Sequence, residues 1–269
     1  MSGKLVLVGT PIGNLKDITL RALEVLKEAD VIACEDTRHS RVLLAAYGIS
    51  KPLISCYKHK EKESAAKIAA LIGEGKTVAL ITDAGMPSVS DPGAIVVKAV
   101  RETGAEVTVA PGPTAFATAV ALSGIECSGF TFLGFMPEKS KDKLRFLEKF
   151  IDSPLPLVFY CSPHNINADA AFLLSVLGDR DVFAVKEITK IFESVTPLRL
   201  NGFQIDEPKG EYVLIVMPGT LKNGLCDLSV AEHVRHYMAA GLAKKDAVKK
   251  VAAERGRPKN EIYMEVLGL

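Results

Sequence analysis

The chain has 269 residues, 48% of them hydrophobic and 24% charged, which is the composition of a globular protein with one large domain or two ordinary ones. A formal net charge of +1 excludes a uniformly basic nucleic-acid-binding chain, so any basic surface must be local. Because no apolar run reaches the ~20 residues of a membrane helix and no signal-peptide pattern opens the chain, we expect a cytoplasmic protein.

The first predicted strand, residues 5–8, runs into a loop at 9–14 that contains glycine and proline, and residues 20–28 have helical spacing. The loop lacks the spacing and the Lys-Ser/Thr ending of a triphosphate-binding loop. A nucleoside triphosphatase is therefore disfavoured.

A second strand is predicted at 31–34, and it ends in five polar residues at 35–39. An α/β protein often places functional side chains at such a strand end, but Asp36 or Thr37 could equally cap a following helix. A short strand at 53–57 comes next.

The central predicted strand is followed by a loop of small side chains. The apolar run 78–81 is β-prone, and the loop 82–90 has so little side-chain bulk that a ligand can approach its backbone closely. Asp91 is predicted to cap the next helix, with Pro92 at its first position and the helix running over 93–100. A strand, a bare loop and a helix in this order predict a binding crevice beyond the carboxyl end of the strand.

A second bare loop, 110–115, follows a strand predicted at 106–109, and Thr114 can cap a helix that runs to Leu122. The alternation of strands and helices up to this point predicts a mainly parallel sheet.

Beyond this helix the predicted strands follow one another with fewer helices between them. This spacing predicts a mixed sheet with hairpins, built from strands at 130–135, 157–161, 182–186, 198–201 and 212–217. We therefore expect an N-terminal α/β domain at 1–114, a second α/β domain at 115–225 and a helical tail at 226–269.

The tail has three predicted helices, at 229–240, 243–255 and 260–267, joined by tight turns that resemble a helix-turn-helix. It is locally basic, and so is the segment 139–149. A solvated helix face explains such charge about as often as a nucleic-acid-binding surface does.

Cysteines and histidines give no sign of a metal centre. The five cysteines are scattered without a CxxC pair, which argues against a zinc site and against a disulfide framework. His233 and His236 are three residues apart with no acidic motif between them, so we interpret them as a pair on a helix surface.

Taken together, these segments resemble the tetrapyrrole methylase superfamily of S-adenosylmethionine (SAM) enzymes, and within it the methylases of small-subunit ribosomal RNA. The resemblance covers nearly the whole chain. It is carried by LVLVGTPIGNLKDIT, EDTRHS, residues 59–61, ITDAGMPSVSDPG, APGPTA, GFMPEKS, residues 189–193, KGEYVLIV and GLAKKDAVKKVA. One such motif would be weak evidence, whereas this many in the same order are specific.

The resemblance implies the two-domain tetrapyrrole methylase fold, that of the class III SAM methyltransferases, with SAM in a cleft between two α/β domains. It also implies a cytoplasmic homodimer that methylates the ribose 2′-hydroxyl of a cytidine in the decoding region of 16S rRNA. By resemblance, SAM contacts are expected from Pro11, Asp83, Ala84, Gly85, Met86, Val89, Ser90, Thr114, Ala115 and Tyr160.

Proton removal from the hydroxyl is assigned, as a hypothesis, to polar groups expected to face the cleft: Asn14, Glu35, Asp36, Arg38, His59 and Lys190. The sequence does not choose among them, although a histidine titrates nearest to neutral pH. RNA contacts are expected from Lys139, Lys141, Lys143, Arg145, Lys244, Lys245, Lys249 and Lys250.

The second domain departs from the family pattern at two positions. Where the family usually has Glu-Ser-Pro-His-Arg, this chain has Cys161 and Asn165 at the two charged positions. Two alternatives stay open: a carbon or nitrogen methylase of a small tetrapyrrole, and a non-catalytic RNA-binding relative. The basic tail speaks against the first, because a small substrate needs no extended basic surface.

Overall fold

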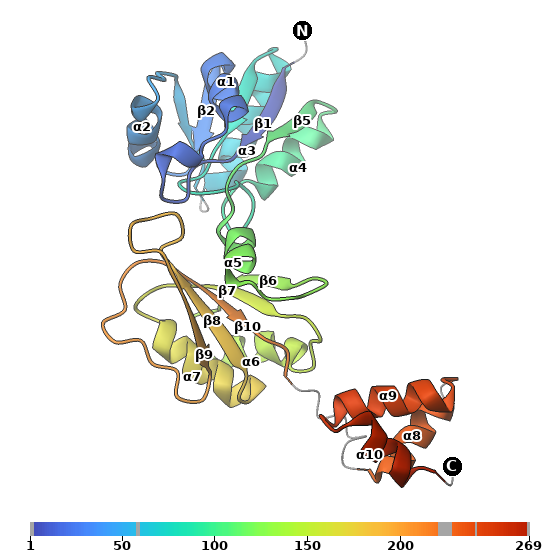
Figure 1. Ribbon diagram of the computed structural model, residues 1–269. Helices are drawn as coiled ribbons and strands as arrows, with labels where there is room; N and C mark the ends of the chain where they lie inside the picture. The colour runs from blue at the N-terminus through green and yellow to red at the C-terminus, as the bar shows by residue number, and fades with distance from the viewer. Residues whose placement is uncertain (1–2, 58–59, 220–227, 240, 268–269) are drawn as a thin grey trace.

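A computed structural model describes residues 3–57, 60–219, 228–239 and 241–267 (Figure 1). Its first lobe is built on a five-stranded sheet in the order β3-β2-β4-β1-β5, in which every pairing is parallel. The strands are β1 (Lys4–Val8), β2 (Val31–Cys34), β3 (Leu53–Ser55), β4 (Thr77–Leu80) and β5 (Glu106–Ala110). The parallel sheet predicted from the alternation of strands and helices is thereby confirmed.

Helices cover both faces of this sheet, because successive residues of a strand point to opposite sides. Val6 and Val8 pack in one buried cluster with Leu26 of the first helix, whereas Leu5 packs on the other face with Ile68 of the third. The helices of the first lobe are α1 (Leu20–Glu28), α2 (Thr37–Ala46), α3 (Glu61–Gly73) and α4 (Ala94–Glu102), with a short 3₁₀ turn, η1, at Leu15–Asp17.

The neighbouring strands β1 and β4 send their connections to opposite sides of the sheet, since β1 leads to β2 and β4 leads to β5. This is a topological switch point, where open α/β sheets bind ligands beyond the carboxyl ends of the strands. The loops after β1, β4 and β5 all lie at that edge.

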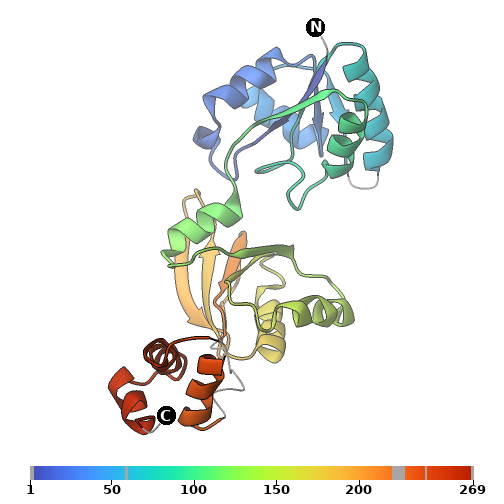
Figure 2. The ribbon, with the colours of Figure 1, turned by 90° about the vertical axis from the view of Figure 1, so that its right-hand side faces the viewer.

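The second lobe is a mixed sheet in the order β6-β7-β10-β8-β9, in which only β6 and β7 pair in parallel. Helix α5 (Ala115–Ser123) leads into it from the first lobe and covers one face, while α6 and α7 cover the other (Figure 2). Its other elements are β6 (Thr131–Phe135), α6 (Ser140–Leu147), the 3₁₀ turn η3 (Glu148–Phe150), β7 (Leu157–Cys161), α7 (Ile166–Leu177), β8 (Asp181–Lys186), β9 (Ser194–Arg199) and β10 (Tyr212–Val216).

Two predicted strands have different limits in the structure. The strand predicted at 198–201 is β9, Ser194–Arg199, which pairs along the whole of β8. Pro197 lies inside it, which is tolerated because β9 is an edge strand and one side of its backbone needs no partner. The strand predicted at 53–57 ends at Ser55, because its only neighbour, β2, ends at Cys34 directly opposite.

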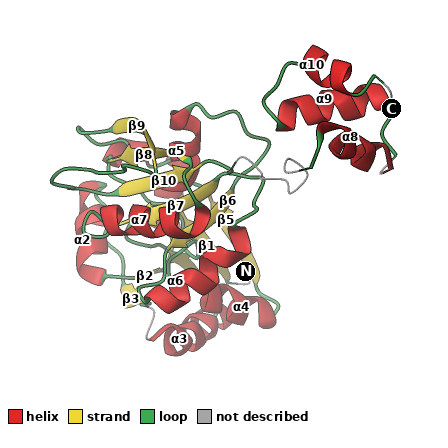
Figure 3. Cartoon of the chain, turned by 90° about the horizontal axis from the view of Figure 1, so that it is seen from below, coloured by secondary structure: helices red, strands yellow, loops and turns green. Residues whose placement is uncertain are grey.

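The tail forms three helices, as predicted: α8 (Val230–Ala239), α9 (Lys244–Glu254) and α10 (Lys259–Glu265). They share a small core of their own and lie apart from the two sheets, past the second lobe and away from the first (Figures 1 and 3). The expected surface pair of histidines is wrong for His233, which is fully buried with its Nε2 atom 2.9 Å from Glu254 Oε2. Within the described parts of the chain, no helix is long and apolar enough to cross a membrane.

Candidate functional site

The loops after β1 and β4 are joined by backbone hydrogen bonds. The Thr10 amide donates to the Gly85 carbonyl at 2.9 Å, and the Gly85 amide donates back to the Thr10 carbonyl at 3.1 Å. The buried Thr10 hydroxyl also donates to the Thr82 carbonyl at 3.1 Å. Residues 82–85 therefore have a fixed position relative to β1.

The loop after β5 approaches so closely that glycine is required on both sides of the contact. A Cβ atom on Gly9 would lie 2.6 Å from Gly112 Cα, and a Cβ atom on Gly112 would lie 2.9 Å from Gly9 Cα. The Gly9 amide also donates to the Ala110 carbonyl at 3.0 Å. All three bare loops are thus held together at one edge of the parallel sheet.

A cavity of about 440 Å³ lies between these loops and the second lobe. The first lobe contributes loop residues 82–86, Val89 and Asp91, and the second contributes the ends of β7 and β10. The complete lining is Ile12, Thr82, Asp83, Ala84, Gly85, Met86, Val89, Asp91, Thr114, Ala115, Phe116, Phe135, Tyr160, Cys161, Ser162, Pro163, Ile188, Glu211, Tyr212 and Val213.

Two serines give the loop its shape at the cavity mouth. Ser88 and Ser90 have φ of 68° and 67°, the left-handed region that side chains other than glycine rarely adopt. A Cβ atom on Gly134 of β6 would lie 2.9 Å from Ser90 Oγ, so the loop reaches the second lobe here. Such strained backbone concentrates at ligand sites, where surrounding contacts hold it in place.

Aromatic rings form the wall on the second lobe. Phe116 stacks on Phe132 with ring centroids 4.3 Å apart, and Tyr160 meets Phe132 at 5.0 Å and Phe135 at 5.4 Å. Burial, as the largest cause, raises the pKa of Tyr160, so its hydroxyl stays protonated at neutral pH. This wall offers an apolar face for a planar ligand group.

Carboxyl groups gather on the wall of the first lobe. Burial, followed by the charges of Glu35 and Asp83, raises the pKa of Asp91 to about 6. The Thr82 hydroxyl donates to Glu35 Oε2 at 3.1 Å, and the Asp36 amide lies 3.4 Å from Asp83 Oδ1. Asp91 is thus a cavity-lining acid that titrates near neutral pH, and the sequence did not identify it as a site residue.

The predicted capping role of Asp91 is wrong. Gly93, with φ of 139°, is the N-cap of α4, and no cap side chain accepts a hydrogen bond there. Instead the buried carboxylate of Glu61 accepts from the amides of Gly93 at 2.8 Å and Ile95 at 3.0 Å. Since Glu61 satisfies the helix terminus from α3, the Asp91 side chain is free to face the cavity.

The predicted SAM-contacting residues gather at this cavity. Asp83, Ala84, Gly85, Met86, Val89, Thr114, Ala115 and Tyr160 line it, whereas Pro11 and Ser90 belong to the same loops without forming its surface. The sequence missed Ile188, Glu211 and Tyr212, which stand at the ends of β8 and β10. Their position depends on how the second sheet pairs, which no local motif reveals.

Among the described members of the predicted catalytic set, none lines the cavity. Asp36 caps α2 and pairs with Arg38 at 2.8 Å, and the hydrogen bond from Arg38 lowers the pKa of Asp36 to about 2. Asn14 caps η1 by accepting from the Lys16 amide at 3.1 Å. His59 lies outside the described residues.

Lys190 lies one hydrogen bond behind the cavity wall. Its Nζ atom donates to Glu187 at 2.9 Å and to the cavity-lining Glu211 at 2.7 Å. Burial opposes the charge of this amine, but the two carboxylates outweigh it and raise the pKa of Lys190. Glu35 is similarly placed, since it accepts a hydrogen bond from the cavity-lining Thr82.

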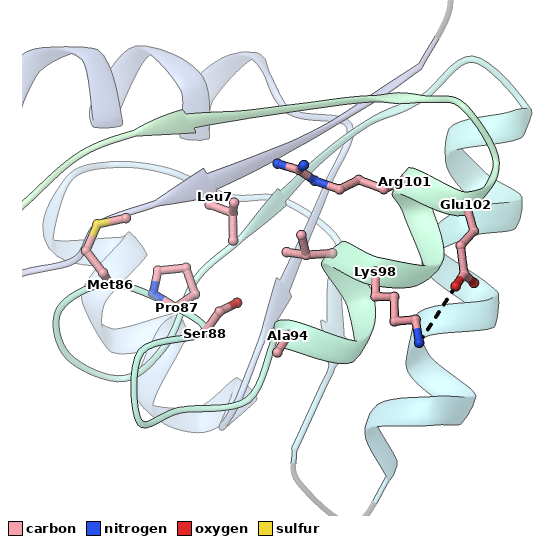
Figure 4. Close-up of a pocket in the computed structure, with 9 residues that line it drawn as sticks. Leu7, Met86, Pro87, Ser88, Ala94, Lys98, Arg101 and Glu102 are labelled. Carbon is pink, nitrogen blue, oxygen red and sulfur yellow. Dashed lines mark ion pairs between the residues drawn. The ribbon is translucent and has the colours of Figure 1, made fainter. Parts of the chain in front are cut away.

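A second hollow, of about 640 Å³, lies on the other side of the same loop, between Met86, Ser88 and helix α4 (Figure 4). Lys98 pairs with Glu102 across 3.9 Å at its rim, and Arg101 extends above Leu7. Its lining comes from the first lobe alone, so the cavity between the lobes, with its aromatic wall and its carboxyl groups, is the better candidate for chemistry.

The structure separates the predicted RNA-contacting cations into exposed and engaged groups. The exposed cations are Lys139, Lys141, Arg145, Lys245, Lys249 and Lys250. In contrast, Lys143 is 15% exposed and forms an ion pair of 2.6 Å with the buried Asp169, so it serves the core of the second lobe. In the tail, Lys244 lies over the Tyr263 ring and Lys250 over the Tyr237 ring.

Comparisons with known proteins agree with this geometry. A family model of the tetrapyrrole (corrin/porphyrin) methylases matches residues 4–203. The chain is 38% identical over 272 residues to the ribosomal RNA small subunit methyltransferase I of Bacillus subtilis, covering 97% of this chain and 93% of that protein. It is 40% identical over 272 residues to the protein of the same name from Haemophilus influenzae, covering 98% and 96%.

Solved structures support the same fold. Diphthine synthase is similar with a TM-score of 0.65 at 15% identity, covering 80% of this chain and 90% of that one. The uroporphyrin-III C-methyltransferase of Thermus thermophilus, complexed with S-adenosyl homocysteine, is similar with a TM-score of 0.56 at 22% identity, covering 81% and 97%. At these identities the likeness shows the fold alone.

Proposed function

We propose that this chain, a member of the tetrapyrrole methylase family and of its branch of small-subunit ribosomal RNA methyltransferases, transfers a methyl group from SAM to 16S rRNA. The acceptor is the ribose 2′-hydroxyl of a cytidine in the decoding region. The observation that carries the proposal is similarity over nearly the full chain to proteins of that name, together with a cavity between the two lobes.

The cavity fits SAM in size and in charge. About 440 Å³ is within the range of small-molecule sites, and the backbone of residues 83–86 and 114–115 is accessible to a ligand. SAM, when bound, supplies a methyl group on a positively charged sulfur. The carboxyl groups of Asp83 and Asp91 give this wall a negative potential that favours a cation, and the aromatic wall suits a planar base.

The residues of this chain must align the reacting groups and take up one proton. Holding reactants in line can supply ~7–11 kcal/mol, and proton transfer to a positioned group typically adds ~10²–10⁴-fold. We add Asp91 to the proposed catalytic set, because it lines the cavity and titrates near neutral pH. Lys190 remains charged and so acts in the proposal as an electrostatic group, not as a base.

Replacing Asp91 with asparagine is expected to lower methyl transfer by ~10²–10⁴-fold if the carboxylate accepts the proton. Methyl transfer by the unmodified protein should fall as pH drops through about 6, where this carboxyl is protonated. The measurement is initial rate against pH at saturating SAM. A variant that keeps full activity across pH 5–9 would exclude Asp91 as the base.

The same substitution, although it lowers activity, is expected to increase the stability of the folded protein at high pH. The folded-state pKa of Asp91 is raised above that of the unfolded chain, so its contribution to stability improves as pH falls from about 7 toward 4. Asp91→Asn should therefore raise the melting temperature at pH 8, and this gain should vanish near pH 4. The exposed Asp206, replaced by asparagine, is the control and should change the melting temperature little, as surface substitutions usually do.

The function itself is tested with small ribosomal subunits from a strain that lacks this gene. Incubation with radiolabelled SAM should transfer label to 16S rRNA, and resistance of one ribose to alkaline cleavage should locate it on a 2′-oxygen. Label on an added tetrapyrrole would support the small-molecule alternative. RNA binding without label would support a non-catalytic relative.

Exposed lysines of the tail are proposed to bind RNA phosphates. The double change Lys245→Glu and Lys249→Glu should weaken binding to small subunits and make the slope of log K against log salt shallower, by roughly one unit for each phosphate that is no longer neutralised. Filter binding between 50 and 300 mM salt measures this. An unchanged slope would show that the tail makes no phosphate contact through these residues.

We further propose that the protein is a cytoplasmic homodimer and that its chain divides into domains at 1–114, 115–225 and 226–269. The separate sheets and the separate tail core support the division. Light scattering at micromolar concentration tests the dimer, and limited proteolysis tests the division, whose boundary at 225/226 lies outside the described residues.

A further inference from the structure

The loop between β8 and β9 carries the most exposed large apolar side chain among the described residues. Ile191 is 94% exposed and its neighbour Phe192 is 72% exposed. We call residues 187–193 the finger. In Figure 1 it rises from the second sheet toward the first lobe, beside η1. Exposing an aromatic ring beside an aliphatic side chain is unfavourable, so a partner that covers them gains free energy.

The finger is held rigidly despite its exposed tip. Glu187 and Thr189 adopt left-handed φ values of 49° and 66°, and the Thr189 amide donates to Glu193 Oε2 at 2.6 Å. The Thr189 hydroxyl donates to Asp17 of η1, which ties the finger to the first lobe. A rigid apolar tip loses little conformational entropy when it binds.

The root of the finger belongs to the cavity. Ile188 lines the cavity and is 6% exposed, and Lys190 bonds the cavity-lining Glu211. Four residues span at most ~14 Å, so Phe192 stands within that distance of Ile188. The tip of the finger is therefore close enough to contact a nucleotide next to one whose ribose faces the cavity.

Charges around the finger decide which part of an RNA can touch it. Four carboxylates lie around it, those of Asp17, Glu187, Glu193 and Glu211, against two cations: Lys190, paired to two of them, and Lys186, whose charge acts on Glu187. Phosphates are repelled from such a surface, whereas the faces of unpaired bases carry no charge and stack on aromatic rings.

We infer that Phe192, supported by Ile191, stacks on an unpaired base next to the nucleotide whose ribose is presented to the SAM-binding cavity, and so positions the RNA strand for methylation. This inference rests on the proposed RNA substrate. The finger then supplies a contact that does not depend on salt, while phosphate contacts are made by lysines elsewhere.

The experiment compares Phe192→Ala with Phe192→Tyr, using small subunits from a strain lacking the gene as the probe. Base stacking is worth enough that Phe192→Ala should weaken binding by ~5–100-fold, whereas Phe192→Tyr should retain most of the affinity. The slope of log K against log salt should stay unchanged for Phe192→Ala, in contrast to the tail variant. SAM affinity, measured by calorimetry, should also be unchanged, because Phe192 does not line the cavity.

The control is Val42→Ala, which removes another exposed apolar side chain, 74% exposed on α2, and should leave binding to the subunits unaltered. Equal binding by Phe192→Ala and the unmodified protein would overturn the inference while leaving the proposed function intact. A change in the molar mass of Phe192→Ala alone in solution would also overturn it, by assigning the finger to contact with a second copy. Failure of the unmodified protein to methylate subunits would instead refute the proposed function.

Discussion

Gly9→Ala is expected to lower SAM affinity by at least about tenfold, because the added Cβ atom has no space. It would lie 2.6 Å from Gly112 Cα and 2.7 Å from Gly112 N, and backbone atoms cannot turn aside as a side chain can. The loop after β5 must move away from β1, carrying Thr114 and Ala115 out of the cavity wall. Overpacking of this kind also costs about 1–3 kcal/mol of stability.

Calorimetric titration with SAM measures the first effect, and urea unfolding measures the second. Gly73→Ala is the matched control, since a Cβ atom on this residue of α3 would meet nothing within 4 Å. It should leave SAM affinity unchanged and be neutral or slightly stabilising in a helix. Tight SAM binding by Gly9→Ala would show that the contact between Gly9 and Gly112 does not position the cavity.

The place of the cavity could be predicted from the sequence because it follows from local patterns. A buried strand followed by a bare loop occurs after β1, β4 and β5, and the carboxyl ends of parallel strands share one edge. The loops 82–90 and 110–115 therefore had to lie together. Which atoms of the second lobe complete the cavity depends on the mixed pairing of β8 and β10, which has no comparable local signal.

Predictions from local sequence patterns were wrong where a residue distant in sequence made the expected hydrogen bonds instead. An aspartate before Pro-Gly is a good helix cap, yet Glu61, thirty-two residues before Gly93, caps α4 and leaves Asp91 to the cavity. Conversely, Asp36 and Arg38 stand at the strand end where functional groups are expected, but they satisfy one another and the helix terminus. For this motif, the structure supports the capping interpretation.

The basic segment at 139–149 shows that the period of a helix can separate core from surface lysines. Lys143 stands four residues before the fully buried Leu147, which places both on one face of α6. Lys141 falls on another face and is exposed. Counting the segment as a uniform basic surface overlooked this difference.

Lys143→Ala is therefore expected to destabilise the second lobe, not to weaken RNA binding directly. The change leaves the carboxylate of Asp169, whose side chain is 8% exposed, without the partner now 2.6 Å away. Breaking a buried ion pair from one side typically costs about 3–5 kcal/mol, because the remaining charge stays buried. Urea and thermal unfolding, monitored with a probe in the second lobe, measure the loss in the free energy of unfolding.

Lys141→Ala, on an exposed face of the same helix, is the control and should change stability by less than about 0.5 kcal/mol. Lys143→Met with Asp169→Asn should recover most of the loss, since neither charge is then buried alone and the side-chain volumes are nearly kept. Wild-type stability in Lys143→Ala, combined with weaker binding to small subunits, would instead assign Lys143 to the RNA surface. The two roles of Lys143 can be distinguished because RNA affinity is measured at low temperature, where even the destabilised variant should remain folded.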